Sequence, residues 1–122
     1  MKKIETICAL ATAVGQSGIG IVRISGPLSQ SIAKQVLGVE LEPRVAYYGE
    51  FYGQERDIVD KGVAIFFPSP NSYTGEDIIE LQGHGGMSIL RCLLETASHF
   101  GARLAEPGEF SKRAFLNGKM DL

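Results

Sequence analysis

Two charged side chains stand inside apolar segments whose alternation is typical of β-strands. Glu80 lies between an isoleucine and a leucine, and Arg23 lies between a valine and an isoleucine. An ionised group beside apolar strands costs free energy unless it is paired or bound to a ligand. The pattern therefore indicates a binding role for Glu80 and Arg23, with a plain solvent-facing position on each strand as the alternative.

A glycine-rich segment, Gly83–Gly86 (GHGG), follows the strand that carries Glu80. It predicts a tight turn around His84, in which the backbone approaches a ligand or a neighbouring strand. His84 is four residues after Glu80, a spacing that would suit a metal site on a helix, but the strand alternation and the glycines oppose that helix. Cys8 and Cys92 are too few and too far apart for a metal site, so we expect reduced cysteines and no metal.

Two segments share part of the pattern of nucleotide-binding loops. The glycine loop at residues 15–20 has the spacing G-x-x-G-x-G, and a strand follows it where a phosphate site needs a helix. A hairpin loop, or a loop that closes over a flat ligand, is the favoured interpretation. Gly118 and Lys119 resemble the end of a P-loop, but Met120 replaces the required hydroxyl residue and Arg113 replaces the first glycine. We expect no GTP site here.

Composition limits the function further. The 122 residues fit one domain over 1–122, and the net charge of −2 argues against binding driven by a nucleic-acid backbone. We expect no signal peptide, and no apolar stretch reaches the roughly 20 residues needed to span a bilayer. No Ser-His-Asp or Cys-His arrangement and no obvious acid/base pair are found, so we expect no catalytic residues and no self-sufficient enzyme.

Hydrophobic periodicity predicts an α+β domain with the order β-β-α-β-β-β-α and a terminal helix. Alternation or continuous apolar runs indicate strands, and a spacing of three to four residues indicates helices, the first of which starts near Pro27 and stops at Gly38. The predicted strands are Thr6–Ala13, Ile19–Ser25, Ala46–Tyr52, Val63–Phe67 and Asp77–Gln82, and the other helices are Met87–Phe100 and a basic one around Lys112–Leu116.

Four segments in order along the chain resemble the amino-terminal domain of the MnmE/TrmE family of tRNA-modification GTPases. The resemblance covers essentially the whole chain and departs from the family in the first glycine loop, where Ala13 and Val14 replace two prolines. The matching segments are Gly20–Gly26 (GIVRISG), Pro70–Asp77 (PNSYTGED), Glu80–Gly86 (ELQGHGG) and Pro107–Lys119 (PGEFSKRAFLNGK).

The resemblance implies a fold, a ligand and partners. The family domain is similar to half of the folate-binding fold of aminomethyltransferases and forms a homodimer. It binds a tetrahydrofolate derivative, 5-formyl- or 5,10-methylene-tetrahydrofolate, through positions that match Arg23, Glu80 and Lys119. The complete family protein is a cytoplasmic GTPase that uses GTP, Mg²⁺ and K⁺. With a flavoprotein of the MnmG/GidA family, it modifies C5 of the wobble uridine in tRNA, which would contact this domain only indirectly.

The residues suit those roles. The carboxylate of Glu80 can accept the adjacent N–H donors of a pterin edge, Arg23 and Lys119 can pair with the glutamate tail, and Tyr73 or Phe110 can supply an aromatic wall. Two alternatives stay open. One is a dimerisation scaffold whose folate pocket is incomplete, and the other is a stand-alone enzyme of the aminomethyltransferase type.

Overall fold

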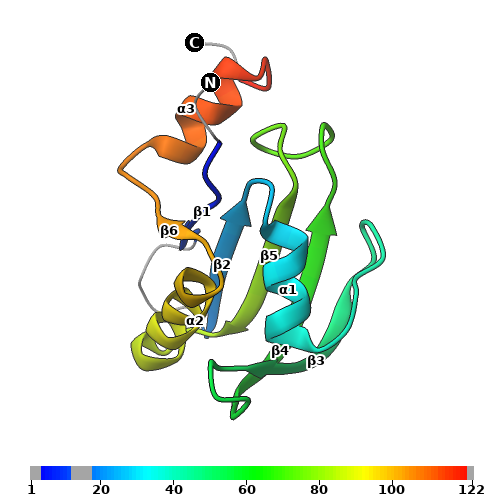
Figure 1. Cartoon of the computed structure of the whole chain (residues 1–122), viewed down its shortest axis with the longest axis vertical. Coiled ribbons are helices and arrows are strands. Elements are labelled where there is room, and N and C mark those ends of the chain that lie inside the picture. Colours follow the sequence, from blue (N-terminus) through cyan, green and yellow to red (C-terminus); the bar gives the residue numbers. More distant parts are fainter. Residues whose placement is uncertain (1–3, 12–17, 121–122) are drawn as a thin grey trace.

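The computed structural model describes residues 4–11 and 18–120. Within these residues the chain forms one six-stranded sheet, in the order β3-β4-β5-β2-β1-β6, and three helices (Figure 1). All neighbouring strands are antiparallel except β1 and β6. The elements are β1 (Ile7–Leu10), β2 (Ile19–Ser25), α1 (Ser29–Leu37), β3 (Tyr47–Tyr52), β4 (Ile58–Phe67), β5 (Ile78–His84), α2 (Met87–His99), β6 (Arg103–Leu104) and α3 (Glu109–Leu116). This mixed α/β domain is compatible with the predicted α+β class.

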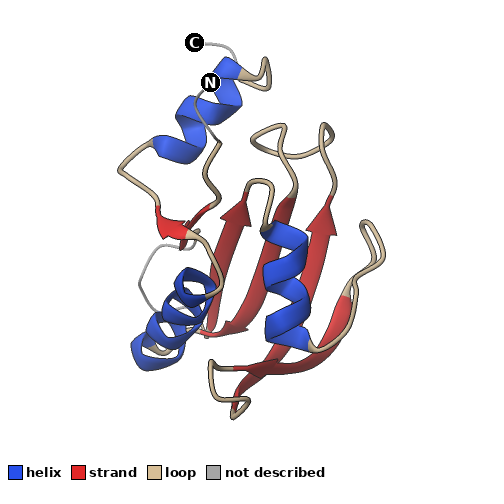
Figure 2. Ribbon diagram, in the orientation of Figure 1, coloured by secondary structure: helices blue, strands red, loops and turns tan. Residues whose placement is uncertain are grey.

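Helices α1 and α2 pack on the same face of the sheet (Figure 2). Alternation along β2 turns Val22 and Ile24 toward these helices, and alternation along β5 does the same for Ile79 and Leu81. These residues form the core with apolar side chains of the two helices, among them Ile32, Val36, Leu90 and Leu93. The opposite face of the sheet therefore receives the intervening residues of β2 and β5, including Arg23 and Glu80.

The helices begin and end close to their predicted limits. The chain leaves α1 through Gly38, whose φ of 74° is in the left-handed region that glycine adopts without a steric penalty. Helix α2 ends at His99, one residue before the predicted end at Phe100. Gly101 follows Phe100 with a φ of 119°. Gly20 permits close packing of α2 on β2, because a side-chain carbon there would lie 2.7 Å from a methyl group of Leu90. This packing explains why a glycine is present at position 20, the last of the three glycines in the G-x-x-G-x-G segment.

Several elements differ from the predicted ranges. Strand β4 begins at Ile58 rather than Val63, because its polar first half pairs with β3 in a hairpin that lacks an apolar pattern. The two-residue strand β6 is too short for periodicity to reveal. Helix α3 begins at Glu109, before the predicted basic segment. Strand β1 ends at Leu10, so Ala11 of the predicted strand lies outside it, while residues 12–14, with the substituted loop positions, lie outside the described residues.

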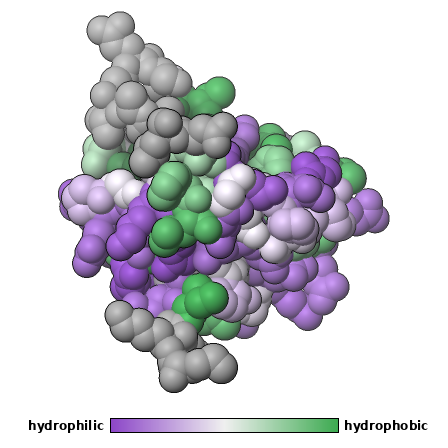
Figure 3. Space-filling model, turned by 90° about the horizontal axis from the view of Figure 1, so that it is seen from above, coloured by the Kyte–Doolittle hydropathy of each residue, from purple (hydrophilic) through white to green (hydrophobic). Residues whose placement is uncertain are grey.

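Seen from above, the surface is mostly hydrophilic with small separate hydrophobic areas (Figure 3). In the described ranges, no helix has the length and apolar character needed to cross a membrane.

Candidate functional site

Arg23 and Glu80 face each other across neighbouring strands on the sheet face opposite α1 and α2. They are direct partners in the antiparallel register of β2 and β5. Both Nε and Nη2 of Arg23 donate to the same carboxylate oxygen, Oε2 of Glu80, at 3.2 and 2.9 Å. Their side chains are 26% and 16% exposed, so water reaches the pair without surrounding it. Glu80 is therefore a paired, partly buried side chain rather than a plainly solvent-facing one.

The second carboxylate oxygen of Glu80, Oε1, accepts fewer hydrogen bonds than Oε2. Oε1 accepts one hydrogen bond, from the amide nitrogen of Gln82 at 3.3 Å. A carboxylate oxygen can accept about two hydrogen bonds, so Oε1 has capacity for a further N–H or O–H donor. Ile65 on β4 is the other strand partner of Glu80 and supplies an apolar neighbour. The arrangement suits a flat ligand with adjacent donors along one edge.

The ring of Tyr73 lies against Arg23, the cation of the ion pair. The Cζ atom of Arg23 is 5.5 Å from the centroid of the Tyr73 ring, within the range of a cation–π contact. Tyr73 is in the loop between β4 and β5, and its hydroxyl lies 3.1 Å from Oγ of Ser111 on α3. Tyr73, one of the two residues considered as an aromatic wall, thus lies beside the guanidinium of Arg23 and contacts helix α3.

Lys119 is exposed beyond the end of α3. Its backbone N–H donates to the carbonyl oxygen of Ala114 at 2.7 Å, and among the described residues its ammonium group forms no ion pair. The structure does not bring Lys119 into contact with Arg23 or Glu80. Gly118 and Lys119 follow a helix, whereas the lysine of a P-loop precedes one, so their order along the chain is the reverse of a phosphate loop.

His84 corrects one expectation. It is the last residue of β5, paired with Ile19, rather than part of a glycine turn. Its backbone N–H donates to Oδ2 of Asp60 at 2.8 Å, and its Nδ1 lies 2.6 Å from Oδ1. The Asp60 side chain is 6% exposed while the His84 ring is 71% exposed. Burial acts to raise the pKa of Asp60, but the hydrogen bonds from His84 outweigh it and hold that pKa below its ordinary value.

Sequence reasoning missed Asp60, and Gly83 was the signal that could have revealed it. A side-chain carbon at Gly83 would overlap Oδ2 of Asp60, so the absent side chain makes room for the carboxylate. On a strand, Glu80 and His84 are roughly 13 Å apart along the chain, too far for one metal ion to bind both. Among the described residues, no three His, Cys, Asp or Glu side chains gather closely enough to hold a metal ion.

A charged network attaches α3 to the rest of the chain, and sequence patterns did not indicate it. Arg103 on β6 pairs with Glu109 through Nη2 and Oε2 at 2.6 Å and also with Glu5 at 3.2 Å. Arg113 pairs with Glu76 at 3.0 Å and with Glu109 at 3.3 Å. The hydrogen bond with Arg103 is the main cause that lowers the pKa of Glu109 to about 2.

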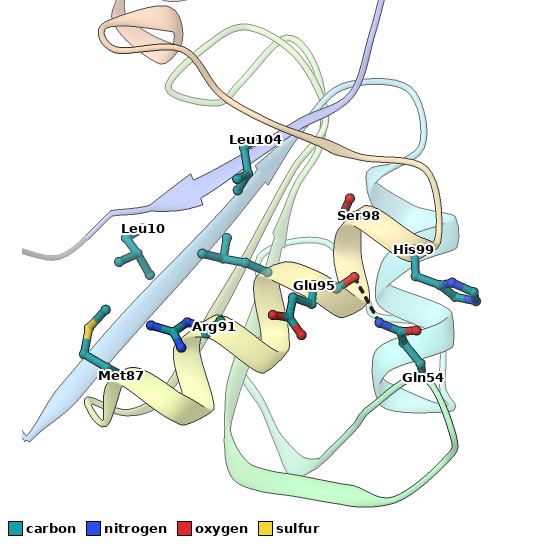
Figure 4. A pocket seen from close by; sticks show the side chains of 9 residues that line it. Leu10, Gln54, Met87, Arg91, Glu95, Ser98, His99 and Leu104 are labelled. Atoms are coloured by element: carbon teal, nitrogen blue, oxygen red, sulfur yellow. Dashed lines mark hydrogen bonds between the residues drawn. The ribbon is translucent and has the colours of Figure 1, made fainter.

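A hollow of about 660 Å³ lies beside α2, away from the ion pair. Met87 and Arg91 on α2 lie below Leu10 and Leu104, which come from β1 and β6 (Figure 4). At the other end, the side chain of Gln54 bonds the backbone oxygen of Glu95 at 3.4 Å. None of the predicted site residues Arg23, Glu80 and Lys119 lines this hollow.

Known proteins are similar to almost the whole chain. The family described as "GTP-binding protein TrmE N-terminus" matches residues 6–119. A tRNA modification GTPase MnmE from Ruthia magnifica is 63% identical over 117 residues, and one from Vesicomyosocius okutanii is 65% identical over 117 residues. Another from Pseudomonas fluorescens is 57% identical over 118 residues. These matches cover 96–97% of this chain and 26% of each relative. The chain thus spans about a quarter of the length of these relatives.

Proposed function

Because the chain belongs to the family of TrmE amino-terminal domains, we propose that it is the folate-binding and dimer-forming module of a tRNA-modification GTPase. The domain binds a reduced folate, 5-formyl- or 5,10-methylene-tetrahydrofolate, and presents its one-carbon unit to chemistry performed elsewhere. GTP hydrolysis with Mg²⁺ and K⁺ belongs to other parts of the longer protein. That protein works in the cytoplasm with a flavoprotein partner on the wobble uridine of tRNA.

The observation that carries the folate proposal is the partly buried Arg23–Glu80 pair. A pterin edge offers adjacent N–H donors, and Glu80 Oε1 has room to accept one of them. A pterin bound to both carboxylate oxygens must share Oε2 with Arg23 or displace it, because that oxygen already accepts two N–H groups. A displaced guanidinium is then available to the carboxylates of the folate tail, with Lys119 as a second cation.

The dimer proposal has a separate basis. In the described part of the chain, α1 and α2 both cover one face, and partly buried apolar residues such as Ile65 and Val63 lie on the other. A second copy that packs on this face would cover them and complete the aminomethyltransferase-like fold, of which each chain supplies half.

Titration calorimetry with 5-formyl-tetrahydrofolate tests the ligand. We expect Glu80→Gln to weaken binding by about tenfold or more, because a charge-assisted hydrogen bond becomes a neutral one. The matched control is Glu95→Gln, which changes an exposed glutamate on α2 and should leave affinity unchanged. Unchanged affinity in a folded Glu80→Gln variant contradicts the site.

Sedimentation tests the dimer and separates the rival function. A dimer should sediment at twice the chain mass of 13.2 kDa. A dimer that gives no heat with millimolar folate supports the scaffold function instead. A monomer at tens of micromolar removes the shared-pocket argument.

A further inference from the structure

Tyr73 contacts both α3 and the candidate folate pair. Its hydroxyl lies 3.1 Å from Oγ of Ser111 on α3, and its ring faces the guanidinium of Arg23, with 5.5 Å between centroid and Cζ. Arg23 in turn bonds Glu80 at 2.9 Å. Three successive side-chain contacts therefore connect α3 with the carboxylate proposed to bind the pterin.

The loop that carries Tyr73 is held between β2 and α3. On the β2 side, Oγ1 of Thr74 lies 2.7 Å from Oγ of Ser25, and both groups are buried. On the α3 side, Asn117 donates to the carbonyl oxygen of Thr74 at 2.8 Å, and Arg113 pairs with Glu76 at 3.0 Å. The backbone that follows Tyr73 is thus tied to α3, and the Tyr73 hydroxyl contacts the same helix.

Helix α3 is attached more weakly than α1 and α2. Its buried residue is Ala114, while Phe115 and Leu116 are 45% and 68% exposed. Its other contacts include ion pairs and hydrogen bonds, and helices shorter than about 12 residues have little stability of their own. A few side-chain contacts therefore make up much of what holds α3 in place, and removing one of them is expected to loosen its docking.

We propose that Tyr73 is a positioning residue that links α3 to Arg23, so that folate binding and docking of α3 favour each other. The proposal rests on the folate function above. With α3 docked, Ser111 holds the Tyr73 hydroxyl, and the ring holds the guanidinium of Arg23 within the site, whether it pairs with Glu80 or with the folate tail. When α3 undocks, Arg23 loses this stacking partner and the site loses its arrangement. Linkage requires the reverse effect, so bound folate must stabilise docked α3 by the same factor.

Two conservative variants and one control test the link. Tyr73→Phe keeps the ring over Arg23 but removes the hydroxyl, and Ser111→Ala removes the other partner of that hydrogen bond. We expect each variant to weaken 5-formyl-tetrahydrofolate binding by about two- to fivefold, the effect of one lost neutral hydrogen bond. The double variant should be no weaker than either single one, since both remove the same contact. Ser88→Ala, an exposed helix serine on α2, should bind like the unchanged protein.

Amide hydrogen exchange measures the docking of α3 directly, and a defect confined to the pocket would leave the exchange rates of α3 unchanged. Saturating folate should slow exchange in residues 109–117 of the unchanged protein, and this slowing should shrink in Tyr73→Phe and in Ser111→Ala. Exchange in β2 should be the same in all variants, which checks that the fold is intact. The link is overturned if the unchanged protein and both variants bind folate with equal affinity. It is also overturned if folate leaves the exchange rates of α3 unchanged.

A separate arm distinguishes failure of the link from failure of the folate function. If the unchanged protein gives no heat with folate, the folate proposal fails for this chain. The link is then tested without ligand, because Arg23→Met removes the stacking partner of Tyr73 and should speed exchange in residues 109–117 by about twofold or more, as expected for a lost cation–π contact. Unaltered α3 exchange in Arg23→Met overturns it.

Discussion

Gly62 is the position where a single added methyl group should disturb the candidate site most directly. In β4 a side-chain carbon at this position would overlap the carbonyl oxygen of Gln82, and it would lie 3.0 Å from both that carbonyl carbon and Cζ of Phe51. Unstrained carbon contacts are about 3.5–4.0 Å long, so the two strands must separate or shift. The neighbouring register pair, Val63 with Gln82, is the last one between β4 and β5 at this end.

The magnitude follows from two local effects. Forcing an extra carbon into a packed site costs about 1–3 kcal/mol, and losing one ladder hydrogen bond costs about 1 kcal/mol. We therefore expect Gly62→Ala to lower the free energy of unfolding by about 2–4 kcal/mol, a large share of the roughly 6–18 kcal/mol typical of a chain this long. Because Gln82 donates to Glu80, folate affinity should fall as well.

Urea unfolding followed by circular dichroism measures this loss. Gly18→Ala is the matched control, since within the described part of the chain nothing lies within 4 Å of the carbon it would add. That control should change the unfolding free energy by no more than about 0.5 kcal/mol. Equal unfolding midpoints for the two variants would refute the steric reasoning.

Three further predictions concern charge and reactivity. Hydrogen bonding to Arg103 holds the pKa of Glu109 at about 2, below its model-compound value of 4.5, so this contact stabilises the fold fully above about pH 4.5 and is lost as the pH falls toward 2. Glu109→Gln should flatten that acid dependence in unfolding experiments, with a loss near neutral pH of about 1 kcal/mol, and an unchanged acid profile would contradict it. Gly83→Ala should push the Asp60 carboxylate away from His84. ¹⁵N NMR of the His84 ring would detect this as a changed chemical shift of Nδ1, and an unaltered spectrum would show that the pair tolerates the methyl group. Burial raises the pKa of Cys8 to about 11, so a thiol reagent at pH 8 should modify Cys92 first and Cys8 after unfolding; equal rates in the native protein would count against burial of Cys8.

Periodicity predicted the elements that position the site because β2 and β5 each have one buried face. The alternation predicted the strands that carry Arg23 and Glu80, and helical spacing located α1 and α2. Pattern alone did not predict that Arg23 and Glu80 pair with each other. They are 57 residues apart, and the order of strands in a sheet is a property of tertiary packing rather than of either segment.

The other misses have the same origin. Asp60 holds His84 from a neighbouring strand, and Arg103 holds Glu109 from β6, a strand of two residues. No local signal identifies such partners, although Gly83 marks the place where one backbone needs space. The folate role of Lys119 stays a prediction, because its ammonium lies in solvent and contacts neither Arg23 nor Glu80.

The strand order also has a consequence for how the chain folds. Strand β2 pairs on one edge with β1, which is near it in sequence, and on the other edge with the more distant β5. Strand β1 also pairs with β6, and its Ile7 and Arg103 are 96 residues apart. Such distant pairings make folding slow, because a long loop must close before the contact stabilises it. A slip of one residue between β2 and β5 would turn Glu80 toward the core and Ile79 toward solvent. The Arg23–Glu80 contact thus forms only in the correct register, and a ligand that requires it selects correctly folded chains.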